Sequence, residues 1–444
     1  MELLLGNTDD TLESMNVHTK QQRIAELARL MPDVSFTSLA YHIDLEWMYE
    51  AYRKTRKNGA PGVDDVTAEE YEEDLDGNLR SLLERFKSGR YFAPPVKRVY
   101  VPKGDGHLRP IGIPALEDKI LQRAVVMVLT PLYEQDFLDC SYGFRPERSA
   151  HQALEALWKG VMGMGGCWIL EVDIKSYFDT VERKHLREFF RKRVRDGVLL
   201  RTIGKWLKAG VFEDGAIHYP KEGTPQGGVV SPLISNIYLH EVLDVWFEEE
   251  VKPRLNGQAE LIRFADDYVI LFTDKRDALR VQEVLPKRFG KYGLTLHDDK
   301  TRLVDFHRPS GSRRHSETFV LLGFTHYWGK SRKGNWVVQR KTAQKKLKTA
   351  VLKVYKWCRV HRHDPVKEQW QALCRKMHGH YGFYGITFNM RSLNRYYEQV
   401  KRAWRKWLNR RSRNRDMPWD RFNPASAGLE RYRLPRPRIV HKFV

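Results

Sequence analysis

The spacing of apolar and polar residues divides the chain into a helical part, a strand-rich part and a second helical part. Residues 18–95 are mainly helical and polar, and Thr67-Ala68-Glu69-Glu70 has the spacing of a capping box at a helix start. Two short runs with alternating β-branched residues, VKRVYVP and HLRPIGIP, follow from residue 96 and predict a hairpin closed near 103–106. Beyond residue 340, apolar residues recur at helical spacing, which predicts an amphipathic bundle.

The central part alternates predicted strands and helices, so the fold class that we expect is α+β. We expect strands at 168–173, 295–305 and 318–327, a strand pair at 261–272, and helices at 117–131, 181–209, 229–250 and 275–291. No internal repeat of fixed period interrupts this order.

The composition favours a large folded enzyme over a disordered or membrane protein. Hydrophobic residues make up 41% of the 444, which is ample for a sizeable core. No stretch approaches 18 consecutive apolar residues, so we expect no membrane-spanning helix, and the N-terminus lacks the cationic start of a secretory signal. The four scattered cysteines favour a reducing cytoplasm.

The positive charge is concentrated at one end of the chain. The formal net charge is +21, and residues 330–444 alone hold 31 Lys and Arg against six Asp and Glu. The same segment contains six Trp, on which bases could stack. A solvated cationic face or an anionic membrane surface would also fit, but nucleic acid is the partner that this charge favours.

Two acid clusters stand at the ends of predicted strands. Asp173 ends an apolar strand, and Asp266 and Asp267 lie at the turn of an apolar hairpin. An Asp-Asp pair is also ordinary turn chemistry. Three carboxylates brought together would bind Mg²⁺, and two such ions support phosphoryl transfer in polymerases. Between the clusters, the glycine-rich turn at 223–228 leads into a helix, and no Walker or dinucleotide motif occurs.

Seven blocks of the chain resemble group II intron-encoded reverse transcriptases and maturases of the bacterial type. In the family's order they are VPKGDGHLRPIGIPALEDKILQRAV, SYGFRPERSAHQAL, WILEVDIKSYFDTV, GTPQGGVVSPLISNIYLHEV, RFADDYVILF, GLTLHDDKT and FVLLGFTHY. They cover about residues 96–327, and weaker similarity continues to about residue 440.

The resemblance implies a right-hand polymerase. Residues 1–95 would form a helical N-terminal extension, and 96–327 the fingers and palm, with an antiparallel sheet plus helices. Residues 328–444 would form an all-helical basic thumb, the maturase or X domain.

The resemblance also implies roles for individual residues. Asp173, Asp266 and Asp267 would bind two Mg²⁺ ions, which Mn²⁺ can replace, with help from the Ile174 carbonyl. Residues matching nucleotide-binding positions are Lys103, Arg109, Gln226, Lys300, and Tyr177 or its neighbour Phe178 as the group that excludes ribonucleotides. Residues matching primer or template positions are Phe264 and Gly323. On the last predicted helix, a cationic face suited to nucleic acid carries Lys401, Arg402, Arg405 and Lys406.

The chain departs from the family pattern in three places. The acid motif begins with Phe264 where the family usually has Tyr, so the ring remains without its hydroxyl. Ser176 stands where the family often has Gly. No Cys/His-rich endonuclease domain follows, so we expect any intron mobility to proceed without target cleavage by this protein.

The function that these observations favour is RNA-directed DNA polymerisation, with binding of group II intron RNA to assist splicing and mobility. The expected partners are that RNA, an RNA template with a DNA primer, target DNA and dNTPs, and no membrane. One alternative is a splicing-only maturase, and another is a domesticated enzyme in DNA repair or phage defence. A zinc site from Cys358, His361, Cys374 and His378 is disfavoured because Cys358 lies on an apolar helix face.

Overall fold

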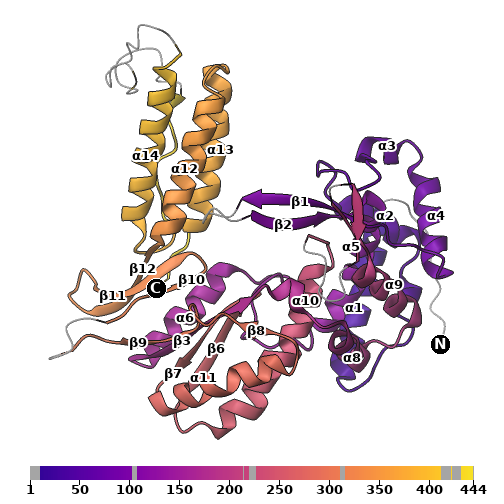
Figure 1. Cartoon of the computed structure of the whole chain (residues 1–444), viewed down its shortest axis with the longest axis horizontal. Helices are drawn as coiled ribbons and strands as arrows, with labels where there is room; N and C mark the ends of the chain where they lie inside the picture. The colour runs from indigo at the N-terminus through magenta and orange to yellow at the C-terminus, as the bar shows by residue number, and fades with distance from the viewer. Residues whose placement is uncertain are drawn as a thin grey trace. The chain divides into compact units, whose positions relative to one another are not determined.

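A computed structural model describes residues 11–102, 108–213, 215–219, 227–310, 316–411, 422 and 432–443 (Figure 1). The chain forms two compact units. The first holds the described residues up to Ala150 together with Leu170–Leu303, and the second holds His151–Ile169 and the described residues from Val304 onward. None of the helices in the described part of the chain has the length and apolar character needed to cross a bilayer.

The first unit begins with helices around a long, buried one. They are α1 (Thr11–Leu30), α2 (Leu45–Lys54), α3 (Ala68–Glu72), α4 (Leu75–Lys87) and the buried α5 (Leu116–Tyr133). The predicted capping box is confirmed, because the Glu70 amide donates to Thr67 Oγ1 (3.3 Å) and the Thr67 amide donates to the Glu70 carboxylate (2.8 Å). The buried Trp47 indole donates to the Ala124 carbonyl (3.0 Å), which ties α2 to α5.

A four-stranded sheet of order β2-β1-β4-β5 follows. Its strands are β1 (Val96–Pro102), β2 (Leu108–Ile113), β4 (Val211–Glu213) and β5 (Ala216–His218). The antiparallel register of β1 with β2, from Lys97 opposite Ile113 to Pro102 opposite Leu108, confirms the predicted hairpin. The closing residues 103–107 lie outside the described residues.

The second sheet has the order β6-β7-β3-β8, with β9 also paired to β3. Its strands are β3 (Gly166–Lys175), β6 (Ala259–Phe264), β7 (Asp267–Phe272), β8 (Thr295–Leu296) and β9 (Arg302–His307). The helices of this region are α7 (Tyr177–Thr180), α8 (Arg183–Arg193), α9 (Gly197–Lys208), α10 (Ser231–Leu239) and α11 (Lys275–Gly290). Residues 268–272 of β7 are completely buried, so this sheet forms the core of the unit.

The helix predicted at 229–250 changes its winding partway. After α10 it continues as two π-helical segments, η2 (His240–Asp244) and η3 (Trp246–Val251). Wider turns of this kind are uncommon and frequently accompany functional sites. Here they carry the completely buried Asp244.

The second unit combines α6 (Ala150–Gly163), a three-stranded antiparallel sheet and three long helices. The strands are β10 (Phe319–Leu321), β11 (Phe324–Lys330) and β12 (Trp336–Thr342). Strand β12 lies in the segment that we expected to be all helical. Its buried face contains Arg340 between Val338 and Thr342, so no apolar alternation marks the strand in the sequence.

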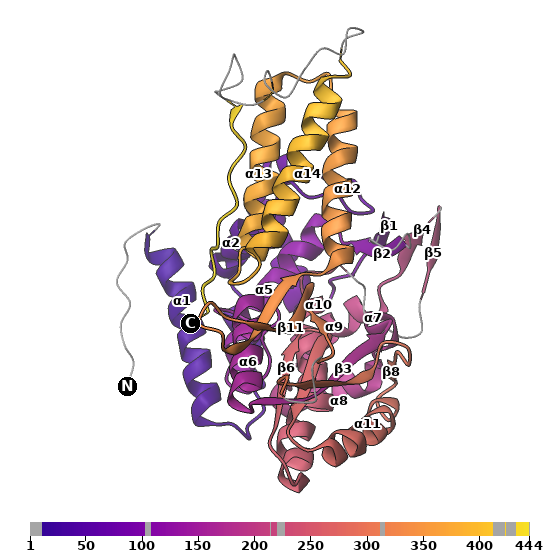
Figure 2. The ribbon, with the colours of Figure 1, turned by 90° about the vertical axis from the view of Figure 1, so that its left-hand side faces the viewer.

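The amphipathic bundle predicted beyond residue 340 is confirmed by three long helices. They are α12 (Gln344–Val360), α13 (Val366–Tyr384) and α14 (Met390–Leu408), and Figure 2 shows them running side by side. Their apolar faces meet in one core that includes Leu347, Cys358, Leu373 and Trp404. The basic side chains are thereby left on the outer faces.

Candidate active site

The structure places the three predicted acids at one edge of the second sheet. Asp173 lies near the end of β3, and Asp267 opens the neighbouring strand β7. Asp266 belongs to the two-residue turn that joins β6 to β7, where Phe264 pairs with Asp267. Strands β7 and β3 are neighbours in the sheet, and neighbouring strands are about 4.8 Å apart, so the strands that carry these acids lie side by side.

Two buried tyrosines record the fields of these carboxylates. Burial raises the pKa of Tyr268 well above its usual value; the charge of Arg263 opposes this shift, and the charges of Asp244 and Asp173 add to it. Burial likewise raises the pKa of Tyr177, and Asp266 adds to that shift. Tyr268 directly follows Asp267 at the start of β7. Asp173 is therefore close enough to this end of β7 for its charge to act there.

A lysine already supplies positive charge at this edge. The Lys300 ammonium lies 2.5 Å from Asp173 Oδ2, and the amide of His297, in the turn before it, donates to the Asp173 carbonyl (2.8 Å). Both charged groups are well exposed, so the pair contributes at most about 1 kcal/mol to stability. Because this ion pair is weak, another cation can replace Lys300 as the partner of Asp173.

The donor chemistry of the site fits a hard divalent cation. Carboxylate oxygens are the ligands that Mg²⁺ prefers, and Asp173 already binds a cationic group. Over the described ranges, however, no three acidic, His or Cys side chains converge into a finished metal site. Asp173, Asp266 and Asp267 are the residues that would hold such an ion.

A buried arginine is hydrogen-bonded to the turn formed by Ala265 and Asp266, called the acid turn below. Arg263 is completely buried, and its guanidinium donates to Asp244 (2.7 Å), to Asn236 Oδ1 (3.1 Å) and to Ser141 Oγ (2.7 Å). It also donates to the carbonyl of Ala265, the turn residue before Asp266 (3.1 Å). Ala265 has a φ of 57°, a left-handed conformation that these bonds hold in place.

The sequence interpretation missed this arginine. Burial lowers the pKa of Arg263, but the adjacent Asp244 raises it by more, so the group stays protonated. The available signal was an arginine inside an otherwise apolar strand, because such a charge requires a buried partner.

The two candidates for the ribonucleotide-excluding position differ in exposure. Tyr177 is 2% exposed and its hydroxyl donates to the Ser235 carbonyl (3.0 Å), whereas Phe178 is partly exposed. Of the two rings, only that of Phe178 is accessible at the surface. The preceding Ser176 has a φ of 47°, which explains why glycine suits this position in the family.

The other predicted residues are distributed over several elements. Arg109 is exposed on β2, and Ile174 pairs with Leu296 in the second sheet. Lys103 and Gln226 lie outside the described residues. Gly323 belongs to the second unit, where Leu322 and Gly323, both with positive φ, form the tight turn between β10 and β11.

The four predicted cations of α14 lie in the C-terminal half of this helix and differ in exposure. Arg402 and Lys406 are exposed, while Lys401 and Arg405 are half-buried. Lys406 Nζ donates to the Tyr355 hydroxyl of α12 (2.8 Å). Not all four charges are therefore equally available to a nucleic acid.

Comparison with known proteins agrees with this arrangement. Residues 101–326 match the family described as "Reverse transcriptase (RNA-dependent DNA polymerase)". Protein YkfC of Escherichia coli strain K12 is 34% identical over 75% of this chain and 94% of its own length. Group II intron-encoded protein LtrA of Lactococcus lactis subsp. cremoris is 37% identical over 64% of this chain.

The chain spans about half of LtrA, since the matched part covers 47% of that protein. Nuclear intron maturase 2 of Arabidopsis thaliana is 26% identical over 44% of this chain. Enzymes of the matched family generally use divalent metal ions, which the acid edge suits. The family match covers half of the chain and includes all three acids, so this protein belongs to the reverse transcriptases, in the group encoded by group II introns.

Proposed function

We propose that this protein extends a DNA primer along an RNA template at the edge formed by Asp173, Asp266 and Asp267. The observation that carries the proposal is that β3, with Asp173, and β7, which follows the turn with Asp266, are neighbouring strands within the matched family region. We propose two Mg²⁺ ions as the metal, with Mn²⁺ as a substitute. When bound, such ions stabilise the attacking and leaving oxygens of a phosphoryl transfer.

The residues of the chain divide the remaining work. Asp173, Asp266 and Asp267, with the Ile174 carbonyl, hold positive charge beside the primer end. Lys300 pairs with Asp173 in the free protein and moves its ammonium to the triphosphate of the incoming dNTP when Asp173 takes another cation.

Binding and selection of the nucleotide are proposed for four further side chains. Phe178 excludes a ribose 2′-hydroxyl by its bulk, which favours dNTPs. Arg109 on β2 binds the triphosphate together with Lys103, and Gln226 contacts the nucleotide. Cationic clamps of this kind stabilise the charge that develops during transfer.

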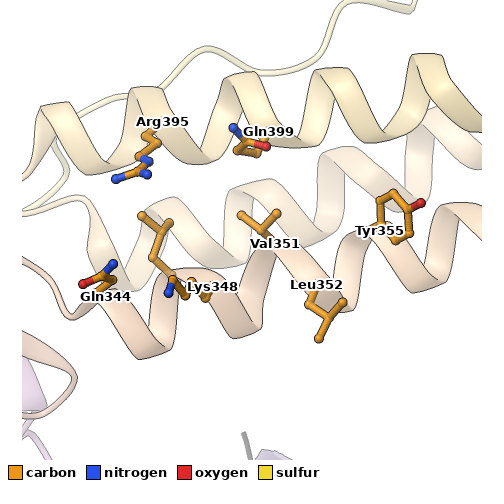
Figure 3. Close-up of a pocket in the computed structure, with 8 residues that line it drawn as sticks. Gln344, Lys348, Val351, Leu352, Tyr355, Arg395 and Gln399 are labelled. Atoms are coloured by element: carbon orange, nitrogen blue, oxygen red, sulfur yellow. The ribbon is translucent and has the colours of Figure 1, made fainter.

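Intron RNA and target DNA are proposed to bind the second unit. A groove between α12 and α14 has the apolar residues Val351 and Leu352 in its lining, with Lys348 and Arg395 as its cations (Figure 3). Its extension along β11 and β12 adds Lys341 and Arg391. Such a mixture binds phosphates by charge and unstacked bases by contact, which would assist splicing and mobility.

The wider assignments belong to the same proposal. We propose that residues 1–95 form the N-terminal extension, residues 96–327 the fingers and palm, and residues 328–444 the thumb, as expected from the sequence. All four cysteines are free thiols, which supports a reducing bacterial cytoplasm.

Substitution of Asp266 with Ala tests the proposal. We expect Mg²⁺-dependent extension of a DNA primer on RNA to fall roughly 1,000-fold or more, because metal stabilisation is worth several kcal/mol. RNA affinity should remain within about twofold, since the cationic surfaces stay intact. Asp33→Ala removes an exposed carboxylate elsewhere in the first unit and serves as the control. Full extension by Asp266→Ala would refute the catalytic assignment.

A further inference from the structure

The sequence motif Ser141-Tyr142-Gly143-Phe144-Arg145 lies directly against the acid turn. Its backbone continues the edge of β6, since the Arg263 amide donates to the Cys140 carbonyl (2.8 Å) and the Tyr142 amide donates to the Arg263 carbonyl (2.8 Å). A Cβ placed at Gly143 would lie 2.3 Å from the backbone nitrogen of Ala265. Only glycine allows this close approach.

The motif is held in one conformation from both sides. Asn236 Nδ2 donates to the Gly143 carbonyl (2.6 Å). The buried Arg145 guanidinium donates to the carbonyls of Leu138 (2.7 Å) and Ser141 (2.8 Å) and to the Glu134 carboxylate (3.0 Å). Hydrogen bonds on both sides therefore fix the backbone of the residue between them, Phe144.

That residue, Phe144, combines two unfavourable features. Its φ is 58°, a left-handed conformation that is an outlier for a bulky residue, and its side chain is 62% exposed. Backbone strain that the surroundings enforce is typical of functional sites. The Phe144 ring centroid lies 6.1 Å from that of Phe264, two residues before Asp266, with 43° between the planes.

We propose that Phe144 and Phe264 form an aromatic platform for the 3′-terminal nucleoside of the primer. This inference rests on the proposed function. The occupant follows from the location, because Gly143 contacts Ala265 and the growing 3′ end must lie beside Asp266 and Asp267. Contact between an aromatic ring and a nucleoside tolerates any base, as a polymerase requires. Phe144 is the new residue in this assignment.

The test compares Phe144→Ala, Phe144→Gly and Phe144→Trp with Phe92→Ala, which removes a phenyl ring that is also mostly exposed elsewhere in the first unit. In steady-state extension, Phe144→Ala should raise KM for the primer–template about tenfold, since such contacts are worth about 1–3 kcal/mol per base. KM for dNTP should stay unchanged, and Phe144→Trp should restore primer binding. Phe144→Gly should lose primer binding without a lower melting temperature, because glycine adopts this φ without strain.

A binding measurement separates this inference from the proposed function. A primer with 2-aminopurine at its 3′ end, annealed to RNA, should change fluorescence with the wild type and Phe92→Ala but not with Phe144→Ala. A 5′-terminal probe should not distinguish them. If wild-type fluorescence changes without extension, the proposed function fails and the platform stands. Equal KM values in Phe144→Ala and wild type, a shift in dNTP KM alone, or parallel losses of melting temperature and binding in Phe144→Gly would overturn the platform.

Discussion

Among the residues that the structure describes, two arginines are completely buried, one in each unit, and their surroundings differ. Arg263 forms an ion pair with Asp244. It also donates hydrogen bonds to Asn236, to Ser141 and to the backbone carbonyl of Ala265 in the acid turn. Arg340, on β12, has no hydrogen-bond partner for its guanidinium among the described residues. The ring of Phe443 lies 4.2 Å from it instead.

The comparison shows that burial alone does not decide whether an arginine in this fold is hydrogen-bonded. Burial lowers the pKa of Arg340 to about 10, with only the field of Glu155 opposing that shift. For Arg263 the neighbouring Asp244 outweighs burial and raises the pKa. A buried charge without bonds opposes folding, whereas a bonded one fixes geometry. The hydrogen-bonded arginine is the one that holds the turn with Ala265 and Asp266.

The largest effect is expected from Arg263→Met. The substitution leaves Asp244 buried without its counter-charge, so unfolding free energy should fall by about 3–5 kcal/mol. Extension activity should fall as well, because the Ala265 carbonyl loses its donor. Urea unfolding and primer extension below the transition measure the two effects.

The double variant Arg263→Met with Asp244→Leu separates stability from positioning. No charge remains buried, so much of the lost stability should return. Extension should stay low, because nothing replaces the bond to Ala265. Full recovery of both properties would mean that the network only stabilises the fold.

A smaller and opposite effect is expected from Arg340→Met. Replacing an unbonded buried charge with an apolar side chain of similar length should leave stability within about 1 kcal/mol of the wild type or raise it. Extension should be unaffected. Lys333→Met, at an exposed turn, is the control for lost charge. A destabilisation above about 2 kcal/mol would show that Arg340 has a strong partner, and the contrast between the two arginines would disappear.

The sequence predicted those features that depend on residues close together along the chain. Asp173, Asp266 and Asp267 stood out because apolar strands end at carboxylates, and the hairpin at 96–113 and the basic helices followed from periodicity. These features depend on neighbours along the chain, so a single sequence contains them.

The missed features depend on tertiary contacts. Asp244 and Arg263 are 19 residues apart and meet because a π-helical segment carries the acid. The left-handed φ of Phe144 is enforced by Gly143 and Arg145, and no residue preference predicts it. The choice between Tyr177 and Phe178 depends on which ring turns into the core after Ser176.

The most direct test of the central claim is metal-directed cleavage of the protein backbone. Fe²⁺ replaces Mg²⁺ in the complex with primer, RNA template and dNTP, and ascorbate then generates hydroxyl radicals at the bound ion. Cleavage near residue 173 and near residues 265–267 in the same complex, suppressed by excess Mg²⁺, is the predicted result. Cleavage at only one of these segments, or at neither, would contradict a shared metal site at this sheet edge.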